Sequence, residues 1–393
     1  MELAFLSPLL AGPLPERAKP WASVYLDTSR ATEDAVKQQD LRRRAVARQL
    51  ADQGADEPTR AAVDGTLAAA PVSGTPAGRA LFATEGSVVL DVPLEAAPAM
   101  PEATWSALPH LAPLLTLRGE DTACLVALID RTGADLELRD GRANGHSRAR
   151  VRLGSAEGEQ WQDRGHRSVP ADRYGWHYEQ RLQDTWDQTA QVIADELTRR
   201  WPDSGARLLV LAGDARERRA VHNRLPDWLQ PHAVEVDGGA RTAGASSEAL
   251  DRRIAEAKTA YRTERLDDAL DQFHAGRGRP GEHGASGPDS SPGPAAEGIP
   301  AVLDAARRHQ VATLLLDESA GDPGRQVWVG PGPDQLASRR TDAHALGVAR
   351  PQPARADDAL LRAAAAAGAE AVLVPTEAGG PAGGVGAVLR WSD

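Results

Sequence analysis

The sequence predicts a protein of mixed α/β and α+β class, with mixed sheets and a small α/β sandwich at its C-terminal end. Two observations predict this class. Short apolar runs typical of strands recur between longer stretches whose apolar residues have helical spacing, from residue 22 to residue 374. The 393 residues, of which 41% are hydrophobic, are enough for two or three domains with packed cores.

The first predicted domain covers residues 1–139. Its strands and helices come in mixed order, which is typical of α+β domains. Two strand-like runs flank Glu85-Gly86, so a hairpin is predicted to turn there. The predicted elements are strands over 22–27, 78–83, 87–90, 124–130 and 134–138, a helix over 33–53, and an apolar segment over 110–117.

The second predicted domain covers residues 140–274. It alternates strand, helix, strand and helix, an order that favours an α/β layer fold. Residues 207–213 are almost continuously apolar, as in a strand buried on both faces. A polar, glycine-bearing loop over 154–174 separates the first strand from a long helix. The predicted elements are strands over 148–153, 207–213 and 233–236, and helices over 178–201, 214–225 and 247–274.

Residues 275–298 are rich in Gly, Pro and Ser, which predicts a flexible linker or insertion. The third predicted domain covers residues 299–393 and is a small α/β sandwich. Its predicted helices cover 300–309 and 356–367, and its predicted strands cover 311–316, 326–329 and 371–374. The chain closes with the run Gly383-Gly384-Val385-Gly386-Ala387-Val388-Leu389-Arg390-Trp391.

Composition and charge exclude several classes of function. The net charge of -11 argues against a general nucleic-acid coat, and DNA is not an expected partner. No run of about 18 apolar residues occurs, so no membrane span is expected. Residues 1–14 have no basic residue before their apolar stretch, unlike a secretory signal. The single cysteine, Cys124, fits a reducing compartment, and we therefore expect a cytoplasmic protein.

No metal and no cofactor are expected. Cysteine and histidine do not occur at metal-ligand spacing, and no phosphate-binding loop of the P-loop type is present. Gly213-Asp214 follows a predicted buried strand, as in some nucleotide sites. It lacks the glycine-rich turn that cradles phosphate, which favours an ordinary strand-to-helix turn.

The segment from Arg139 to Arg181 carries a local excess of positive charge. It has nine arginines and six acidic residues, a difference of +3 in a chain of net charge -11. Arginine binds phosphate in a bidentate manner, and aromatic faces stack on unpaired bases, so this mixture is typical of RNA contacts. Alternatively, Trp176 and Tyr178 anchor the first turn of the following helix. The predicted RNA-binding residues are Arg164, His166, Arg167, Arg173, Tyr174, Trp176, His177, Gln180 and Arg181.

Three features together resemble one known superfamily. They are three α/β-type domains in this order, a long polar loop before the long central helix, and the closing Gly-Gly-Val-Gly-Ala-Val-Leu-Arg-Trp run. The chain resembles the archaeal and eukaryotic release factor 1 and Pelota superfamily, whose C-terminal signature has a similar glycine run before Leu-Arg-Tyr. It is most similar to the bacterial branch found in actinobacteria, with relatives of the hibernation factor Balon and of the Vms-type peptidyl-tRNA hydrolases.

This resemblance implies a three-domain, release-factor-like architecture that occupies the ribosomal A site. The first domain would face the decoding centre, and the central loop would contact ribosomal RNA at the peptidyl transferase centre. The third domain would bind a partner, either a translational GTPase such as elongation factor Tu or a ribosomal protein.

The hallmark motifs of the superfamily are absent. Catalytic members carry Gly-Gly-Gln in the central loop, where glutamine orients a water molecule; here Gly175 and Gln180 are five residues apart. The Asn-Ile-Lys-Ser stop-codon motif is also absent. The leading hypothesis is a catalytically silent hibernation or ribosome-protection factor with no catalytic residue. The alternatives are a peptidyl-tRNA hydrolase that uses Gln180 to rescue stalled ribosomes, and a small-molecule or stress-signalling α/β protein that shares the fold.

Overall fold

The structure is a computed structural model, and it forms two compact units. Among the described residues, unit 1 holds those of 1–120 and 265–393, and unit 2 holds those of 121–264. The described residues are 3, 6–10, 20–28, 35–69, 77–94, 96–118, 122–140, 149–157, 175–238, 247–277, 294–317 and 324–391.

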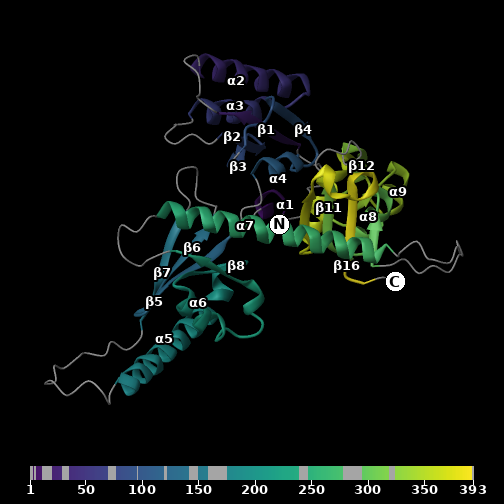
Figure 1. The fold of residues 1–393 in the computed structure, drawn as a ribbon. Coiled ribbons are helices and arrows are strands. Elements are labelled where there is room, and N and C mark those ends of the chain that lie inside the picture. The colour runs from purple at the N-terminus through teal and green to yellow at the C-terminus, as the bar shows by residue number, and fades with distance from the viewer. Residues whose placement is uncertain are drawn as a thin grey trace, which may run out of the picture. The chain divides into compact units, whose positions relative to one another are not determined.

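The N-terminal part of unit 1 contains a four-stranded antiparallel sheet in the order β3-β2-β1-β4 (Figure 1). Successive residues of a strand face opposite sides of a sheet. Val24 and Leu26 therefore pack against α2 and α3, whereas Tyr25 packs toward α1 and α4. The elements are α1 (Ser7–Leu10), β1 (Trp21–Asp27), α2 (Ala35–Asp52), α3 (Glu57–Ala68), β2 (Gly78–Thr84), β3 (Ser87–Leu94), β4 (Glu102–Ser106) and α4 (Ala112–Arg118).

Two local features shape this sheet. Glu85 and Gly86 both have positive φ, 53° and 76°, as a two-residue type I′ turn requires, and the predicted hairpin is confirmed. β4 is an edge strand, and the side-chain amide of Gln53 pairs with it. The amide nitrogen donates to the carbonyl of Ala103 at 2.8 Å, and the amide oxygen accepts from the backbone N–H of Trp105 at 2.8 Å. Gln53 thus takes the place of a neighbouring strand and covers part of this edge.

The C-terminal part of unit 1 contains a four-stranded sheet in the order β10-β16-β11-β15, with helices on both faces. One face packs against the last part of α7 through Phe273, and the other packs against α8 and α10. A second, three-stranded antiparallel sheet has the order β13-β12-β14 and contacts α9. The elements are α7 (Ser247–Gly276), β10 (Ala295–Glu297), α8 (Ile299–Arg307), β11 (Val311–Asp317), β12 (Gln326–Val329), β13 (Leu336–Ala337), α9 (Arg340–Ala345), β14 (Gln352–Arg355), α10 (Ala356–Ala366), β15 (Glu370–Val374) and β16 (Val385–Leu389).

One continuous apolar core joins the N-terminal and C-terminal parts of unit 1. Tyr25 and Phe82 of the N-terminal sheet share this core with Leu360 of α10, and Leu6 is buried within it. Helices α1 and α10 are in direct contact. Residues at the two ends of the chain therefore stabilise each other by removing apolar surface from water.

Unit 2 is a five-stranded mixed sheet in the order β7-β6-β5-β8-β9, where β5, β8 and β9 are parallel. Ile193 of α5 belongs to the core on one face, and Ile254 of α7 to the core on the other. Both faces of β5 and β8 are therefore buried, as the apolar run over 207–213 predicts. The elements are β5 (Cys124–Asp130), β6 (Gly133–Asp140), β7 (Ala149–Glu157), α5 (Gly175–Ser204), β8 (Leu208–Gly213), α6 (Ala215–His222), β9 (Ala233–Asp237) and the first part of α7.

The predicted fold class is confirmed, since the chain combines mixed sheets with helical layers. The boundaries of the three predicted domains stay a prediction. Residues 295–297, inside the stretch expected to be a linker, form β10 and pair with β16. No helix among the described residues is long and apolar enough to cross a membrane.

Candidate functional site

The predicted RNA-binding residues fall at the connection between β7 and α5. Arg164, His166, Arg167, Arg173 and Tyr174 lie outside the described residues. The other four, Trp176, His177, Gln180 and Arg181, lie in the first two turns of α5, and only their backbone is described. All nine therefore fall between the end of β7 and the second turn of α5, and the contacts of their side chains stay a prediction.

Arg139, the first arginine of the positive segment, has a structural role. It is 6% exposed, and its guanidinium lies 2.7 Å from Asp251 of α7 and 3.1 Å from Glu137 of β6. A buried arginine neutralised by two carboxylates is not free to bind phosphate. Within the segment from Arg139 to Arg181, a phosphate contact is therefore expected from the other arginines and not from Arg139.

Arg218 of α6 is also engaged within unit 2. Arg218 lies 2.7 Å from Asp237 and 3.2 Å from Glu235, and it donates to the carbonyl of Gly213 at 2.8 Å. Asp214 accepts a hydrogen bond from the backbone N–H of Arg216 and caps α6, so this is the ordinary strand-to-helix turn that the sequence favours.

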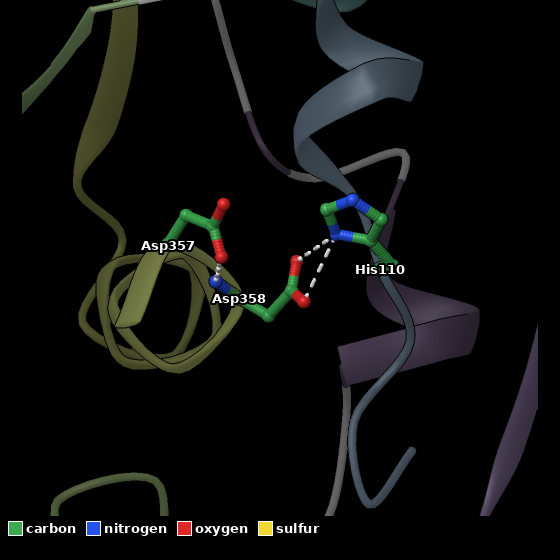
Figure 2. Close-up of side chains that lie close together, drawn as sticks. All are labelled: His110, Asp357 and Asp358. Atoms are coloured by element: carbon green, nitrogen blue, oxygen red, sulfur yellow. Dashed lines mark hydrogen bonds and ion pairs between the residues drawn. The ribbon is translucent and has the colours of Figure 1, made fainter. Parts of the chain in front are cut away.

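A second cluster of ionisable groups lies inside unit 1, where the sequence gives no sign of it. His110 precedes α4, and Asp357 and Asp358 lie in the first turn of α10. The three residues are 4%, 1% and 2% exposed. Figure 2 shows the imidazole of His110 directed at the carboxylate of Asp358, with Nδ1 lying 3.1 Å from Oδ2. We name these three residues the buried cluster.

The backbone around the buried cluster is fixed by further hydrogen bonds. The N–H of Leu111 donates to Oδ1 of Asp358 at 2.8 Å. Asp358 therefore binds the segment just before α4 twice, through the side chain of His110 and through the backbone of Leu111. The N–H of His110 donates to Oγ of Ser23, and the hydroxyl of Tyr25 donates to the carbonyl of His110 at 2.5 Å. β1, the start of α4 and the start of α10 therefore meet at one polar point within the apolar core.

Charges surround the buried cluster on several sides. Arg355 lies 2.7 Å from Asp357 and 3.9 Å from Asp358. Glu102 of β4 lies 3.7 Å from Nε2 of His110. The two buried carboxylates thus face one arginine and one imidazole, and the charges can balance when His110 is protonated.

The pKa values of the buried pair are displaced. Burial raises the pKa of Asp358 from 3.8 to about 6, although the hydrogen bond from His110 acts against this increase. For His110, burial acts to lower the pKa, but the hydrogen bond and the charge of Asp358 outweigh it, and the pKa is raised above 6.5. Above about pH 6 and below the raised pKa of His110, the pair exists as a carboxylate and an imidazolium.

The buried cluster can be compared with a metal site, because its potential ligand atoms lie within 4.8 Å of one another. Its carboxylate oxygens already have protein partners, however. Asp358 accepts from His110 and Leu111, and Asp357 accepts from Arg355 and from the N–H of Asp358. A cation would have to displace these bonds next to a fixed guanidinium, so we assign the cluster to an internal ion pair and not to a metal centre.

We expect the buried pair to make stability fall as pH rises. The folded state binds a proton more tightly than the unfolded chain at Asp358 between pH 3.8 and about 6, and at His110 from pH 6.5 up to its raised pKa. Unfolding free energy falls with pH wherever the folded state holds more protons. Denaturant titrations across this pH range, for the wild type and for the double variant His110→Gln/Asp358→Asn, measure the effect by difference.

The expected difference between the wild type and this double variant declines steadily with pH. A difference that is constant or that increases with pH would show that the pair does not titrate as a proton-sharing unit. Carboxylates distant from the pair titrate in both proteins, so their contribution to the pH dependence of the unfolding free energy cancels in the difference.

Comparisons with known proteins found a family model that matches most of unit 2 and a relative that matches almost the whole chain. Residues 123–279, from β5 to just beyond α7, match the model of the bacterial archaeo-eukaryotic release factor family 2. An uncharacterized protein of Mycobacterium tuberculosis is 27% identical over 378 residues, covering 95% of this chain and 94% of the relative.

Three solved structures show distant likenesses. The Saccharomyces cerevisiae protein Dom34, a translation termination-like factor, is 9% identical, covers 80% of both chains and has a TM-score of 0.38. A ribosome-bound archaeal Pelota is 14% identical, with 99% of this chain and 94% of that chain covered and a TM-score of 0.36. The archaeal translation termination factor aRF1 is 17% identical, with coverage of 99% and 96% and a TM-score of 0.23.

Proposed function

We propose, on the premise that residues 123–279 belong to the bacterial archaeo-eukaryotic release factor family 2, that this protein binds the ribosome as a release-factor-like protein in the A site. The family match confirms the resemblance to the bacterial branch of the superfamily, and it is the observation that carries the proposal. The matched segment contains β7, α5 and their connection, which are the elements that would present the RNA-binding residues.

Within this proposal, the connection between β7 and α5 contacts ribosomal RNA. Its arginines supply bidentate donors to phosphate, and Tyr174 and Trp176 supply rings for unpaired bases. The described arginines on the rest of unit 2 support this assignment indirectly. Arg139, Arg218 and Arg224 each pair with a carboxylate of the same unit, so these three arginines are not expected to supply the phosphate contacts.

The proposed factor is catalytically silent. Water activation in a release factor requires a glutamine at a glycine-rich loop tip, where the backbone can approach the reacting ester. Gln180 lies in the second turn of α5, and Gly175 is the first residue of that helix. The backbone of Gln180 is therefore part of a regular helix, and this position supports ribosome protection or hibernation over peptidyl-tRNA hydrolysis.

The proposal also includes the cellular location and the partners of the protein. A ribosome-bound factor acts in the cytoplasm, and a translational GTPase such as elongation factor Tu is the proposed partner of the C-terminal domain.

Ribosome binding should depend on the connection before α5. We expect the triple variant Arg167→Ala/Arg173→Ala/Trp176→Ala to lower affinity for purified ribosomes by at least about tenfold, because two phosphate contacts and one stacking contact are lost. Co-sedimentation with idle ribosomes and with ribosomes that carry peptidyl-tRNA measures this affinity. The same reactions report whether the ester is cleaved, and we expect it to stay intact.

A matched control removes the same residue types from elsewhere in unit 2. Arg199 and Arg253 are paired with glutamates on their own helices, and Trp228 is 53% exposed. The variant Arg199→Ala/Arg253→Ala/Trp228→Ala should keep wild-type affinity. The proposal fails if the wild type does not sediment with ribosomes. Cleavage of peptidyl-tRNA that Gln180→Ala abolishes would replace the silent factor with a hydrolase.

A further inference from the structure

The three-stranded sheet of unit 1 has an exposed face rich in arginine. We define the outer arginine face as Trp328 of β12 together with Arg339, Arg340 and Arg350. We propose that this face binds the phosphate backbone of single-stranded RNA, with a base stacked on Arg340. This contact is separate from the connection between β7 and α5, and it belongs to the other compact unit.

Alternation along β12 separates the two faces of this sheet. Val327 and Val329 are buried in the core of unit 1, whereas Trp328 points to the opposite side and is half-buried. Trp328 lies opposite Ala337 of β13 and Pro353 of β14. The ring therefore sits on small, apolar neighbours in the middle of the outer face.

Arg340 lies over this ring. Its guanidinium carbon is 5.5 Å from the centre of Trp328, a distance typical of a cation–π contact. Arginine also stacks its flat guanidinium on planar groups, so Arg340 on Trp328 can present a second planar surface to a base. Figure 1 shows α9, whose first residue is Arg340, beside β12.

The positions of the other two arginines follow from chain register. Arg339 comes two residues after Ala337, which pairs with Trp328, and it leads into α9. Arg350 comes two residues before Gln352, which pairs with Val329 at the other end of β12. Both arginines are exposed, and register places them at opposite ends of β12, Arg339 near Gln326 and Arg350 beyond Val329.

The charge of this region is not balanced. Residues 324–355 contain five arginines and two aspartates, a difference of +3 in a chain of net charge -11. Arg355 is engaged by Asp357, whereas Arg339, Arg340 and Arg350 form no ion pair with a described residue. In the same unit, Arg43, Arg44 and Arg307 each pair with an aspartate. The outer arginine face thus offers uncompensated donors to an anionic polymer.

RNA fits this face better than an acidic protein segment. An acidic segment would use the arginines, but it has no need of a guanidinium held flat on an indole ring. A single-stranded nucleic acid uses both features, because it carries regularly spaced phosphates and exposed base faces.

The test compares binding of a fluorescein-labelled oligouridylate to the full-length chain and its variants by fluorescence anisotropy. We expect Arg339→Ala/Arg340→Ala/Arg350→Ala to lower affinity by about tenfold or more. The slope of log K against log salt should fall in magnitude by about 1.4, since Arg339 and Arg350 each lose a phosphate contact and each such contact on a single strand contributes about 0.7. Arg340→Lys keeps the charge, so it should retain the salt slope and still lose affinity through weaker stacking.

The control variant Arg43→Ala/Arg44→Ala/Arg307→Ala removes the same charge from arginines that already have carboxylate partners, and it should leave RNA affinity within about twofold. Unchanged RNA affinity in the outer-face variant overturns the proposal. A variant that keeps RNA affinity but loses ribosome binding also overturns it, and it would indicate an acidic ribosomal protein as the partner. If the wild type binds oligouridylate through this face but does not sediment with ribosomes, the A-site proposal fails and the RNA-binding face stands.

Discussion

Asp358→Ala is expected to lower the free energy of unfolding of unit 1 by about 3–5 kcal/mol, the usual cost of removing one partner from a buried ion pair. The carboxylate is almost fully buried and accepts hydrogen bonds from Nδ1 of His110 and from the N–H of Leu111. Its loss leaves two polar groups without an acceptor inside an apolar core, and each unsatisfied group carries a desolvation penalty.

Two further variants separate charge from hydrogen bonding. Asp358→Asn keeps an oxygen that can accept from Leu111, so it should cost less than Asp358→Ala. Asp304→Ala serves as a matched control, because Asp304 is an exposed aspartate on α8 that pairs only with Arg307 one turn along the same helix. The control should change stability by no more than about 0.5 kcal/mol.

The measurement is denaturant unfolding combined with hydrogen exchange resolved by peptide. Loss of the buried pair should raise exchange first in α4 and at the start of α10, because these segments meet at Asp358. Exchange in β8 of unit 2 should stay near the wild-type rate. A cost below about 1 kcal/mol, or uniform loss of protection in both units, would show that the buried pair does not hold the two parts of unit 1 together.

The buried cluster also shows where prediction from the sequence ends. His110 and Asp358 are 248 positions apart. Nothing in the local pattern of either segment requires the other, since spacing along a chain reveals only contacts within one element or between neighbouring elements. The doublet Asp357-Asp358 at the start of a predicted helix is explained locally by the helix dipole, so it gives no signal of a distant histidine.

Strong local patterns were predicted well. β5 matches the predicted strand over 124–130, and the hairpin at Glu85-Gly86 forms, because these segments combine clear periodicity with turn chemistry. α3, β4, β13 and β14 were missed, whereas β12 forms over the predicted residues 326–329. β4 has only one fully buried residue, and Gln53, which directly follows α2, supplies part of its pairing. This is a contact between segments about 50 positions apart.

Helix α7 illustrates a different limit. The sequence predicts a helix over 247–274, and the helix forms over Ser247–Gly276. Its first part packs on the sheet of unit 2 through Leu250 and Ile254, and its last part packs on the C-terminal sheet through Phe273. Apolar spacing shows which positions of a helix are buried, but not which sheet buries them.

Phe273→Ala is expected to destabilise the C-terminal sheet by about 3–5 kcal/mol. Phe273 is fully buried and packs against Leu315 of β11 and Val388 of β16. It also explains one glycine of the closing run, Gly386. A Cβ atom at Gly386 would lie 2.8 Å from the ring of Phe273 and 2.8 Å from Cβ of Pro381, closer than packed carbon atoms approach. Because Gly386 has no side chain, the ring of Phe273 can pack directly against its backbone.

Gly386→Ala should consequently cost about 1–3 kcal/mol through overpacking. Gly65→Ala provides the matched control: Gly65 lies within α3, and no atom lies within 4 Å of a Cβ built there. That substitution should stabilise the protein by about 0.5–1 kcal/mol, because alanine favours the helix.

The two core variants should not be additive. Removal of the Phe273 ring relieves one of the two close contacts of a Cβ at Gly386 and leaves the contact with Cβ of Pro381. Gly386→Ala should therefore cost less in the Phe273→Ala background than alone, by about 1 kcal/mol. Denaturant unfolding of the wild type, both single variants and the double variant gives this coupling energy. If the two effects simply add, the ring of Phe273 is not what requires glycine at position 386. The requirement would then lie with Pro381, whose Cβ is equally close to a Cβ at Gly386.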